Sequence, residues 1–296
     1  MSEVSVIGLG RMGSTLARCL LDHGFGVTVW NRTSARSEEL IANGAGSAES
    51  PGHAFSASPV SLVCLADGYA ALRELLGNQV ASGALEGRAL VQLSTGTPRD
   101  ARDLGEQIRS LGAGYADGAM LAFPEEIGTE SCVFLVAGAG TARSARILRT
   151  LAPAMVDLGD DVGAPAALDL AILSMMLGAM LGTAHALAIA RAEGVLDRFA
   201  EISPDLAALV PEDVARAVEL VRSTGYADPP ATVETWLGVA ERLRQHSADA
   251  ELDDAFPEIA NSLYTRALAR GYGNLDPAVV TEILSERGSN GSDEGP

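Results

Sequence analysis

The chain has 296 residues, 47% of them apolar, and its 21 basic and 39 acidic residues give a net charge of −18. This composition excludes a disordered chain, and the length favours two domains or one large domain. The acidic surface repels phosphate backbones and anionic lipid, which argues against nucleic-acid and membrane binding. Every basic residue is an arginine, so chemistry that needs a lysine, such as a Schiff base, is excluded.

The cysteine and histidine residues of the chain indicate neither a redox function nor a metal site. The three cysteines are far apart in the sequence and form no C-x-x-C pair, so neither a disulfide framework nor a redox motif is indicated. The four histidines lack metal-ligand spacing, and we predict no metal site. The chain opens into a strand-like segment without a basic leader, and we expect a cytoplasmic protein.

Short apolar runs alternate with amphipathic stretches in the first half of the chain. The predicted strands are residues 4–9, 26–30, 62–66, 89–93, 114–117 and 132–137, and the first helix is expected at 14–23. Strand–helix alternation is typical of a parallel sheet covered on both faces. We therefore predict an α/β fold with a doubly wound Rossmann sheet over residues 1–161.

The second half reads as helical. Residues 162–191 are rich in Ala, Leu and Met with Asp169 as the only charge before Arg191, which predicts one long helix. This stretch is long enough to cross a membrane, but the polar residues within it favour a helix buried at a domain or subunit interface. Amphipathic helices follow at 211–223, 231–246 and 256–270, within a helical domain over 192–286, and residues 287–296 are expected to be a disordered tail.

A glycine-rich turn joins the first strand to the first helix. It reads Gly8-Leu9-Gly10-Arg11-Met12-Gly13. The first glycine permits the tight turn, the second lets the backbone approach a pyrophosphate, and the third lets the helix pack on the strand. The helix N-terminus then stabilises the diphosphate. The motif predicts a dinucleotide site.

The end of the second strand indicates which dinucleotide binds. It carries Asn31-Arg32-Thr33, with Arg36 one helical turn later. An acid there would grip the ribose hydroxyl of NAD, whereas a guanidinium makes a forked contact with a 2′-phosphate. Unless both arginines are merely solvated surface charges, the cofactor is NADPH. The ends of the next strands are expected to complete its site with Leu65, Ala66, Ser94 and Thr95.

With its long helix and helical second half, the chain resembles the β-hydroxyacid dehydrogenase superfamily, whose C-terminal domain is like that of 6-phosphogluconate dehydrogenase. Two superfamily motifs are broken. The glycine-rich turn that grips a substrate carboxylate is replaced by the apolar segment Asp117–Phe123, and Asp169 stands at the position of the catalytic lysine. The groups needed to oxidise a hydroxy acid are therefore missing.

Both departures resemble the imine reductases. The segments that carry this resemblance are Asp117–Glu130, Ala167–Ala171, Asn31–Thr33 and Leu93–Pro98. The resemblance implies NADPH-dependent reduction of the C=N bond of cyclic imines. It also implies a homodimer whose long helices are exchanged between subunits.

Asp169 is the candidate catalytic residue. A lone carboxylate in an apolar wall could stabilise an iminium ion, or burial could raise its pKa so that it donates the proton. The alternative is an acid that only stabilises the helix dipole. Leu173, Met176 and Leu177 share its helical face, and Met120 and Phe123 suit an apolar amine. For Trp236 two interpretations stay open, closure of the substrate pocket from the partner subunit and core packing.

Two other functions were weighed. A hydroxyacid or carbonyl dehydrogenase on the same fold is disfavoured by the missing lysine and carboxylate turn. A non-catalytic NADPH-binding protein would bind cofactor without turnover on any imine or carbonyl. The physiological substrate, the stereoselectivity and any coupling of amine to ketone are not readable from the sequence.

Overall fold

The computed structural model describes residues 2–66, 68–78, 83–207 and 210–286. The chain divides into two compact units, Met1–Met175 and Met176–Pro296. The predicted tail, residues 287–296, lies outside the described residues.

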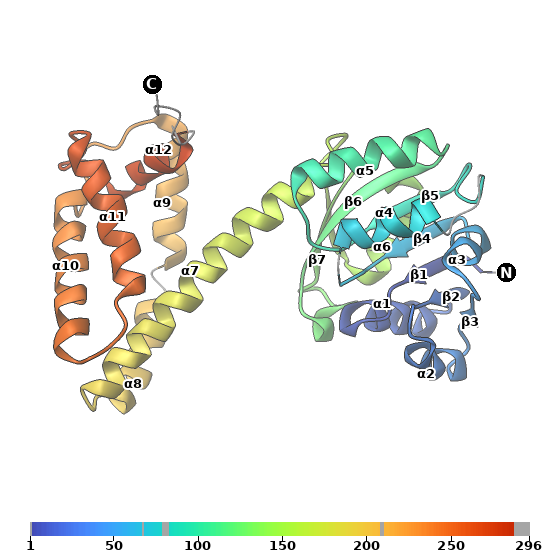
Figure 1. Cartoon of the computed structure of the whole chain (residues 1–296), viewed down its shortest axis with the longest axis horizontal. Coiled ribbons are helices and arrows are strands. Elements are labelled where there is room, and N and C mark those ends of the chain that lie inside the picture. Colours follow the sequence, from blue (N-terminus) through green and yellow to red (C-terminus); the bar gives the residue numbers. More distant parts are fainter. Residues whose placement is uncertain (1, 67, 79–82, 208–209, 287–296) are drawn as a thin grey trace, which may run out of the picture. The chain divides into compact units, whose positions relative to one another are not determined.

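The first unit is built on a sheet of eight strands among its described residues (Figure 1). In sequence order the strands are β1 (Val4–Ile7), β2 (Val27–Trp30), β3 (Gly46–Ser47), β4 (Val60–Val63), β5 (Ala89–Gln92), β6 (Gly114–Leu121), β7 (Val133–Ala137) and β8 (Ala154–Asp157). Their spatial order is β3-β2-β1-β4-β5-β6-β7-β8. The order reverses between β1 and β4, the place where open α/β sheets bind ligands.

Helices cover both faces of this sheet, as predicted. They are α1 (Arg11–Asp22), α2 (Glu38–Ala42), α3 (Pro51–Ala57), α4 (Gly68–Asn78), α5 (Pro98–Ser110) and α6 (Thr141–Leu151), with short 3-10 turns η1 (Ser34–Ser37) and η2 (Pro124–Glu126). Side chains alternate between faces along each strand, so Val6 packs in the core under α1 and α6 while Ile7 packs in the core under α3, α4 and α5. The predicted fold class is confirmed.

The sheet differs from the prediction in one respect. All neighbours are parallel except β6 and β7, which are antiparallel, with Asp117 opposite Ala137 and Leu121 opposite Val133. A short connection of 3-10 turn and loop joins these two strands, and a parallel crossover needs a longer one, usually with a helix. The alternation that predicted a wholly parallel sheet therefore breaks at this pair.

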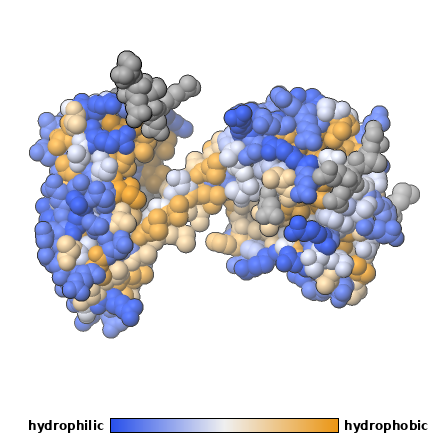
Figure 2. Space-filling model, in the orientation of Figure 1, coloured by the Kyte–Doolittle hydropathy of each residue, from blue (hydrophilic) through white to orange (hydrophobic). Residues whose placement is uncertain are grey.

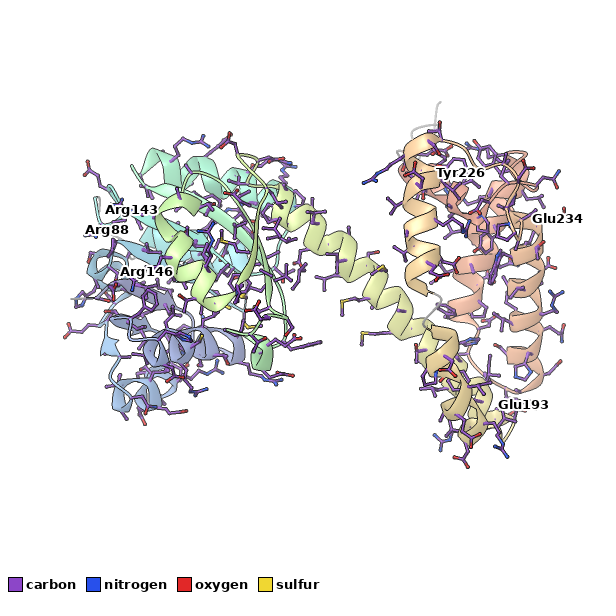
Figure 3. The ribbon with its side chains drawn as sticks, turned by 180° about the vertical axis from the view of Figure 1, so that it is seen from behind. Arg88, Arg143, Arg146, Glu193, Tyr226 and Glu234 are labelled. Carbon is purple, nitrogen blue, oxygen red and sulfur yellow. The ribbon has the colours of Figure 1, made fainter. Side chains whose placement is uncertain are left out.

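Side chains also connect α6 to the N-terminal end of the chain. Arg146, labelled in Figure 3, places its guanidinium carbon 4.5 Å from the ring centroid of Phe25 and pairs with Glu3 at 3.1 Å. This stacking and pairing fixes α6 beside the N-terminal strand.

The long helix α7 (Ala164–Ala192) begins and ends within two residues of the predicted bounds. It is long and apolar enough to cross a membrane by length and composition, with a mean hydropathy of 1.8 in its best window. Only 17% of that window is buried in the single chain. Figure 2 shows hydrophobic residues along the length of this helix.

The second unit is helical, as predicted. After α7 come α8 (Leu196–Ala207), α9 (Val210–Ser223), α10 (Val233–Asp249), α11 (Ala255–Ala269), the 3-10 turn η3 (Pro277–Val279) and α12 (Val280–Ser285). The α8 and α12 helices were not predicted.

A small core with a polar edge holds these helices together. Tyr226, Val233 and Ile283 are buried in this core, and the Tyr226 hydroxyl, labelled in Figure 3, donates to Glu282 at 2.7 Å. His185, on the C-terminal half of α7, lies 3.3 Å from the Ser247 hydroxyl of α10. Its ring also lies against that of Phe256 on α11.

Candidate active site

The turn between β1 and α1 needs glycine at three positions for three different reasons. Gly8 has a φ of +96°, and a Cβ added there would lie 2.2 Å from the Cys64 carbonyl oxygen. A Cβ on Gly13 would lie 1.9 Å from the Gly8 carbonyl oxygen, so this glycine lets α1 pack on the turn. Gly10 has open space around its Cα instead. The open side is where a ligand can approach the backbone.

The N-terminus of α1 is free to bind an anion. Gly10 is its N-cap, without a side-chain hydrogen bond, and the first turn contains no acid. The N–H groups of a helix's first turn have no partner within the helix, and these groups and the helix dipole favour negative charge. Arg11 and Met12 follow in this first turn.

Asn31 connects the glycine turn to the end of β2. Its Oδ1 accepts from the Leu9 N–H at 2.9 Å, and its Nδ2 donates to the Thr33 carbonyl oxygen at 2.9 Å. An aspartate could not make the second contact, because an ionised carboxylate has no donor. The side chain thus holds the turn and the arginine segment in one arrangement.

A cavity of about 330 Å³ lies over this turn. Nine of the residues predicted to bind cofactor line it: Gly8, Leu9, Gly10, Asn31, Arg32, Thr33, Arg36, Leu65 and Ala66. It is also lined by Trp30, Cys64, Ala71, Glu74 and Leu75, which the sequence did not indicate. Three of these five, Ala71, Glu74 and Leu75, lie on α4, and no local motif predicts how that helix lies over the sheet.

Both arginines of the cavity are available to a ligand. Within the described ranges, neither Arg32 nor Arg36 lies within salt-bridge distance of a carboxylate. Two exposed guanidinium groups beside an open helix N-terminus suit a dinucleotide with an additional phosphate on its ribose. The residues present therefore fit NADPH, as the sequence predicts.

The other predicted cofactor residues do not line this cavity; they are Arg11, Met12, Gly13, Ser94 and Thr95. The Ser94 hydroxyl accepts from the Leu65 N–H at 2.9 Å and donates to Gln92 Oε1 at 3.1 Å. Ser94 is buried, so its hydroxyl joins the ends of β4 and β5. Thr95 is exposed at the next position.

Asp169 is the buried carboxylate of α7. It is 7% exposed, whereas its neighbours Leu168 and Leu170 are exposed. Burial raises the pKa of Asp169, and a hydrogen bond from Thr95 acts in the opposite direction. The two residues, predicted separately from a helix and from a loop after β5, are therefore brought together.

The predicted substrate residues are divided between the two units. Met120 is half-buried on β6, and Phe123, just after that strand, is 62% exposed. Leu173 belongs to the first unit and is exposed on α7. Met176, Leu177 and Trp236 belong to the second unit, where all three are exposed. Their role in a substrate pocket stays a prediction.

The two parts of the chain match two domain families. Residues 3–149 match the NAD-binding domain of 6-phosphogluconate dehydrogenase, which assigns the first unit to the dinucleotide-binding oxidoreductases. Residues 161–286 match the C-terminal domain of the NADPH-dependent reductive aminase-like proteins.

Relatives that match nearly the whole chain define its protein class more narrowly. The NADPH-dependent reductive aminase of Aspergillus oryzae is 28% identical over 301 residues, covering 95% of this chain and 97% of the relative. Glyoxylate/succinic semialdehyde reductase 1 of Arabidopsis thaliana is 28% identical over 292 residues, 95% of this chain and 98% of that protein. The structure of the imine reductase of Myxococcus stipitatus in complex with NADP+ is 32% identical, with a TM-score of 0.89 over 95% of this chain and 99% of that one. The chain belongs to the imine reductase family, which confirms the resemblance found in the sequence.

Proposed function

We propose that the protein is an NADPH-dependent imine reductase, which reduces the C=N bond of an imine or iminium ion to an amine. NADPH, when bound, supplies the hydride that the C=N carbon accepts. The cavity lined by the glycine turn, Arg32 and Arg36 would hold its adenosine end and phosphates. The relatives named as a reductive aminase and an imine reductase support the reaction.

The observation that carries the chemistry is the buried carboxyl group of Asp169 in a chain without lysine. A carboxyl group beside a substrate nitrogen can donate a proton to it, or can stabilise its positive charge when ionised. Both actions make the carbon a better hydride acceptor. The exposed residue Thr95 acts on this carboxyl group in the direction of a lower pKa.

Carbonyl reduction is the rival reaction, since the Arabidopsis relative is named as a semialdehyde reductase. An enzyme of that superfamily type needs a lysine for the hydroxyl proton, and this chain has none. The apolar segment Met120–Phe123 also contains no polar side chain that could bind a carboxylate. We therefore favour an apolar imine over a hydroxy acid.

The test is consumption of NADPH with five- and six-membered cyclic imines by the wild type and Asp169→Ala. We expect turnover that falls by about 10²-fold or more in the variant, the scale of a lost proton-transfer or charge-stabilising group. Asp160→Ala, which removes an exposed carboxylate just before α7, is the control and should keep wild-type turnover. Turnover with semialdehydes but with no imine would contradict the proposal.

We further propose that the protein is a homodimer and that α7 contributes to its interface. The exposed apolar residues of this helix support this, because a helix apolar along most of its length is normally covered. The second copy would exchange helices with the first and complete the substrate pocket, with Trp236 as a candidate contribution. The three free cysteines support a location in the reducing cytoplasm.

A further inference from the structure

An arginine of α5 holds the start of α7. Arg102 donates from Nε and Nη2 to the two carboxylate oxygens of Asp161, at 3.0 Å and 2.9 Å. Asp161 lies just before α7, which begins at Ala164, and its Oδ1 also accepts from the Gly163 N–H at 2.9 Å. A forked pair of this kind fixes the relative orientation of both side chains. We call Arg102, Asp161 and Gly163 the α7 clamp.

Gly163 leaves the space that the guanidinium group of Arg102 occupies. A Cβ added to Gly163 would lie 2.6 Å from Arg102 Cζ and 2.7 Å from its Nε. Gly163 is not one of the glycines with a positive φ, so other residues can adopt its backbone conformation. An alanine at this position would therefore displace the guanidinium group without straining the backbone.

Buried residues connect the α7 clamp to Asp169. Val162 packs against the core under α3, α4 and α5. It lies between two glycines, since a Cβ on Gly105 would be 3.2 Å from its Cγ2 and one on Gly138 would be 2.6 Å from its Cγ1. Ala166 is 4% exposed in the same core, and Asp169 is 7% exposed. Because backbone hydrogen bonds make an α-helix stiff over two turns, the position of the helix start determines where the Asp169 carboxyl group lies.

The charges of the clamp are fixed at neutral pH. Arg102 and the Gly163 N–H hold the pKa of Asp161 at about 2, so this carboxyl group is ionised. Both side chains are half exposed, at 53% for Arg102 and 55% for Asp161. An ion pair with that exposure contributes little to global stability. Its effect is therefore expected in the placement of α7 rather than in the melting temperature.

We propose that Arg102 is a positioning residue, which fixes the start of α7 through Asp161 and Gly163 and thereby holds Asp169 at the substrate nitrogen. The proposal rests on the proposed role of Asp169 in imine reduction. Arg102 is not among the residues that line the cavity for NADPH, so cofactor binding does not depend on it. A small displacement of a group that acts on the substrate lowers the rate strongly, even when the change that causes it is remote.

The first experiment measures the placement of residue 169 without turnover. In Asp169→Cys, alkylation of the new thiol by N-ethylmaleimide is followed by peptide mass spectrometry, which separates it from the three native cysteines. Because residue 169 is buried, alkylation requires local opening. Adding Arg102→Ala should accelerate it by roughly threefold to fivefold, the scale of one well-formed ion pair. An unchanged rate would overturn the proposal.

The second experiment measures turnover of a cyclic imine by Arg102→Ala. We expect kcat to fall by about tenfold through misplacement, less than the loss of about 10²-fold expected for Asp169→Ala. The dissociation constant of NADPH should stay within about twofold of the wild-type value. Arg102→Lys, which keeps the charge but not the forked contact, should lose less turnover. A parallel loss of NADPH affinity would indicate a structural role and contradict the proposal.

Two double variants test whether the effect passes through the α7 clamp to Asp169. Adding Arg102→Ala to Asp169→Ala should not lower kcat further, since a positioning residue has no effect when the group that it positions is absent. Gly163→Ala should lower kcat like Arg102→Ala and should add nothing to it in the double variant, because both changes remove the same contact. Additive losses in either pair would overturn the proposal. Gly163→Ala also takes the place of Arg102→Ala if that variant does not fold.

Arg99→Ala is the matched control. Arg99 is an exposed arginine of α5 that pairs with Asp103 of the same helix at 3.8 Å, and its variant should match the wild type in all these measurements. A change in Arg99→Ala as large as that in Arg102→Ala would contradict the proposal. Absence of turnover in the wild type would refute the imine reaction, and the alkylation rates would then decide whether the α7 clamp places residue 169.

Discussion

Gly10 and Gly13 are three residues apart in one motif, yet the structure gives them opposite surroundings. Gly13 is enclosed, with the Gly8 carbonyl oxygen where its Cβ would be, while Gly10 has nothing within 4 Å of an added Cβ. One glycine is therefore required by the fold and the other by the ligand. A sequence motif cannot distinguish these two requirements, but substitution can.

We predict that Gly13→Ala lowers the free energy of unfolding by about 1–3 kcal/mol, the usual cost of overpacking. Gly10→Ala should change stability by less than about 0.5 kcal/mol and weaken NADPH binding by about tenfold or more, since the methyl group occupies the path of the pyrophosphate. Chemical denaturation and titration with NADPH measure the two effects. Wild-type affinity in Gly10→Ala would show that the cofactor does not approach this turn.

Among the elements, α7 contains both the buried candidate catalytic carboxyl group and a series of exposed apolar side chains. Asp169 is buried near its start, while farther along Leu177 is 58% and Met180 is 67% exposed. A membrane or a second copy of the chain could cover such residues. The homodimer proposal gives them a protein partner.

The corresponding prediction concerns the mass in solution without detergent. Wild type should have twice the chain mass of 30.5 kDa by light scattering, and Leu177→Glu with Met180→Glu should shift it toward the monomer, because charges are costly in an apolar interface. Leu111→Glu, an exposed leucine of the first unit, is the control. A monomeric wild type, or one that stays dispersed only in detergent, would contradict the dimer.

At the scale of the whole molecule, the sequence predicted best those elements that are marked by a short continuous run of residues. Continuous apolar runs located β1, β2, β5 and β7 to within two residues, since buried strands have few alternatives. The two-residue β3 has no such run, and β8, whose last two residues are exposed, was also missed. An apolar pattern also carries no information on strand direction, so the antiparallel pairing of β7 with β6 was not predicted.

The candidate site was likewise predicted only in part. The glycine turn and the Asn31–Arg36 segment were predicted because motif spacing reflects backbone geometry. Glu74 in the cavity and the hydrogen bond from Tyr69 to Asp117 depend on how α4 lies on the sheet. Contacts of that kind are formed by residues far apart in sequence, and no local pattern specifies them.

The central claim is that hydride from NADPH is delivered to the carbon of a C=N bond. Its most direct test uses NADPH deuterated at the transferring position with a cyclic imine, followed by mass spectrometry of the product. We predict an amine carrying one deuterium on the former imine carbon, at a rate that depends on Asp169. An amine without deuterium, or no amine although NADPH binds, would contradict it.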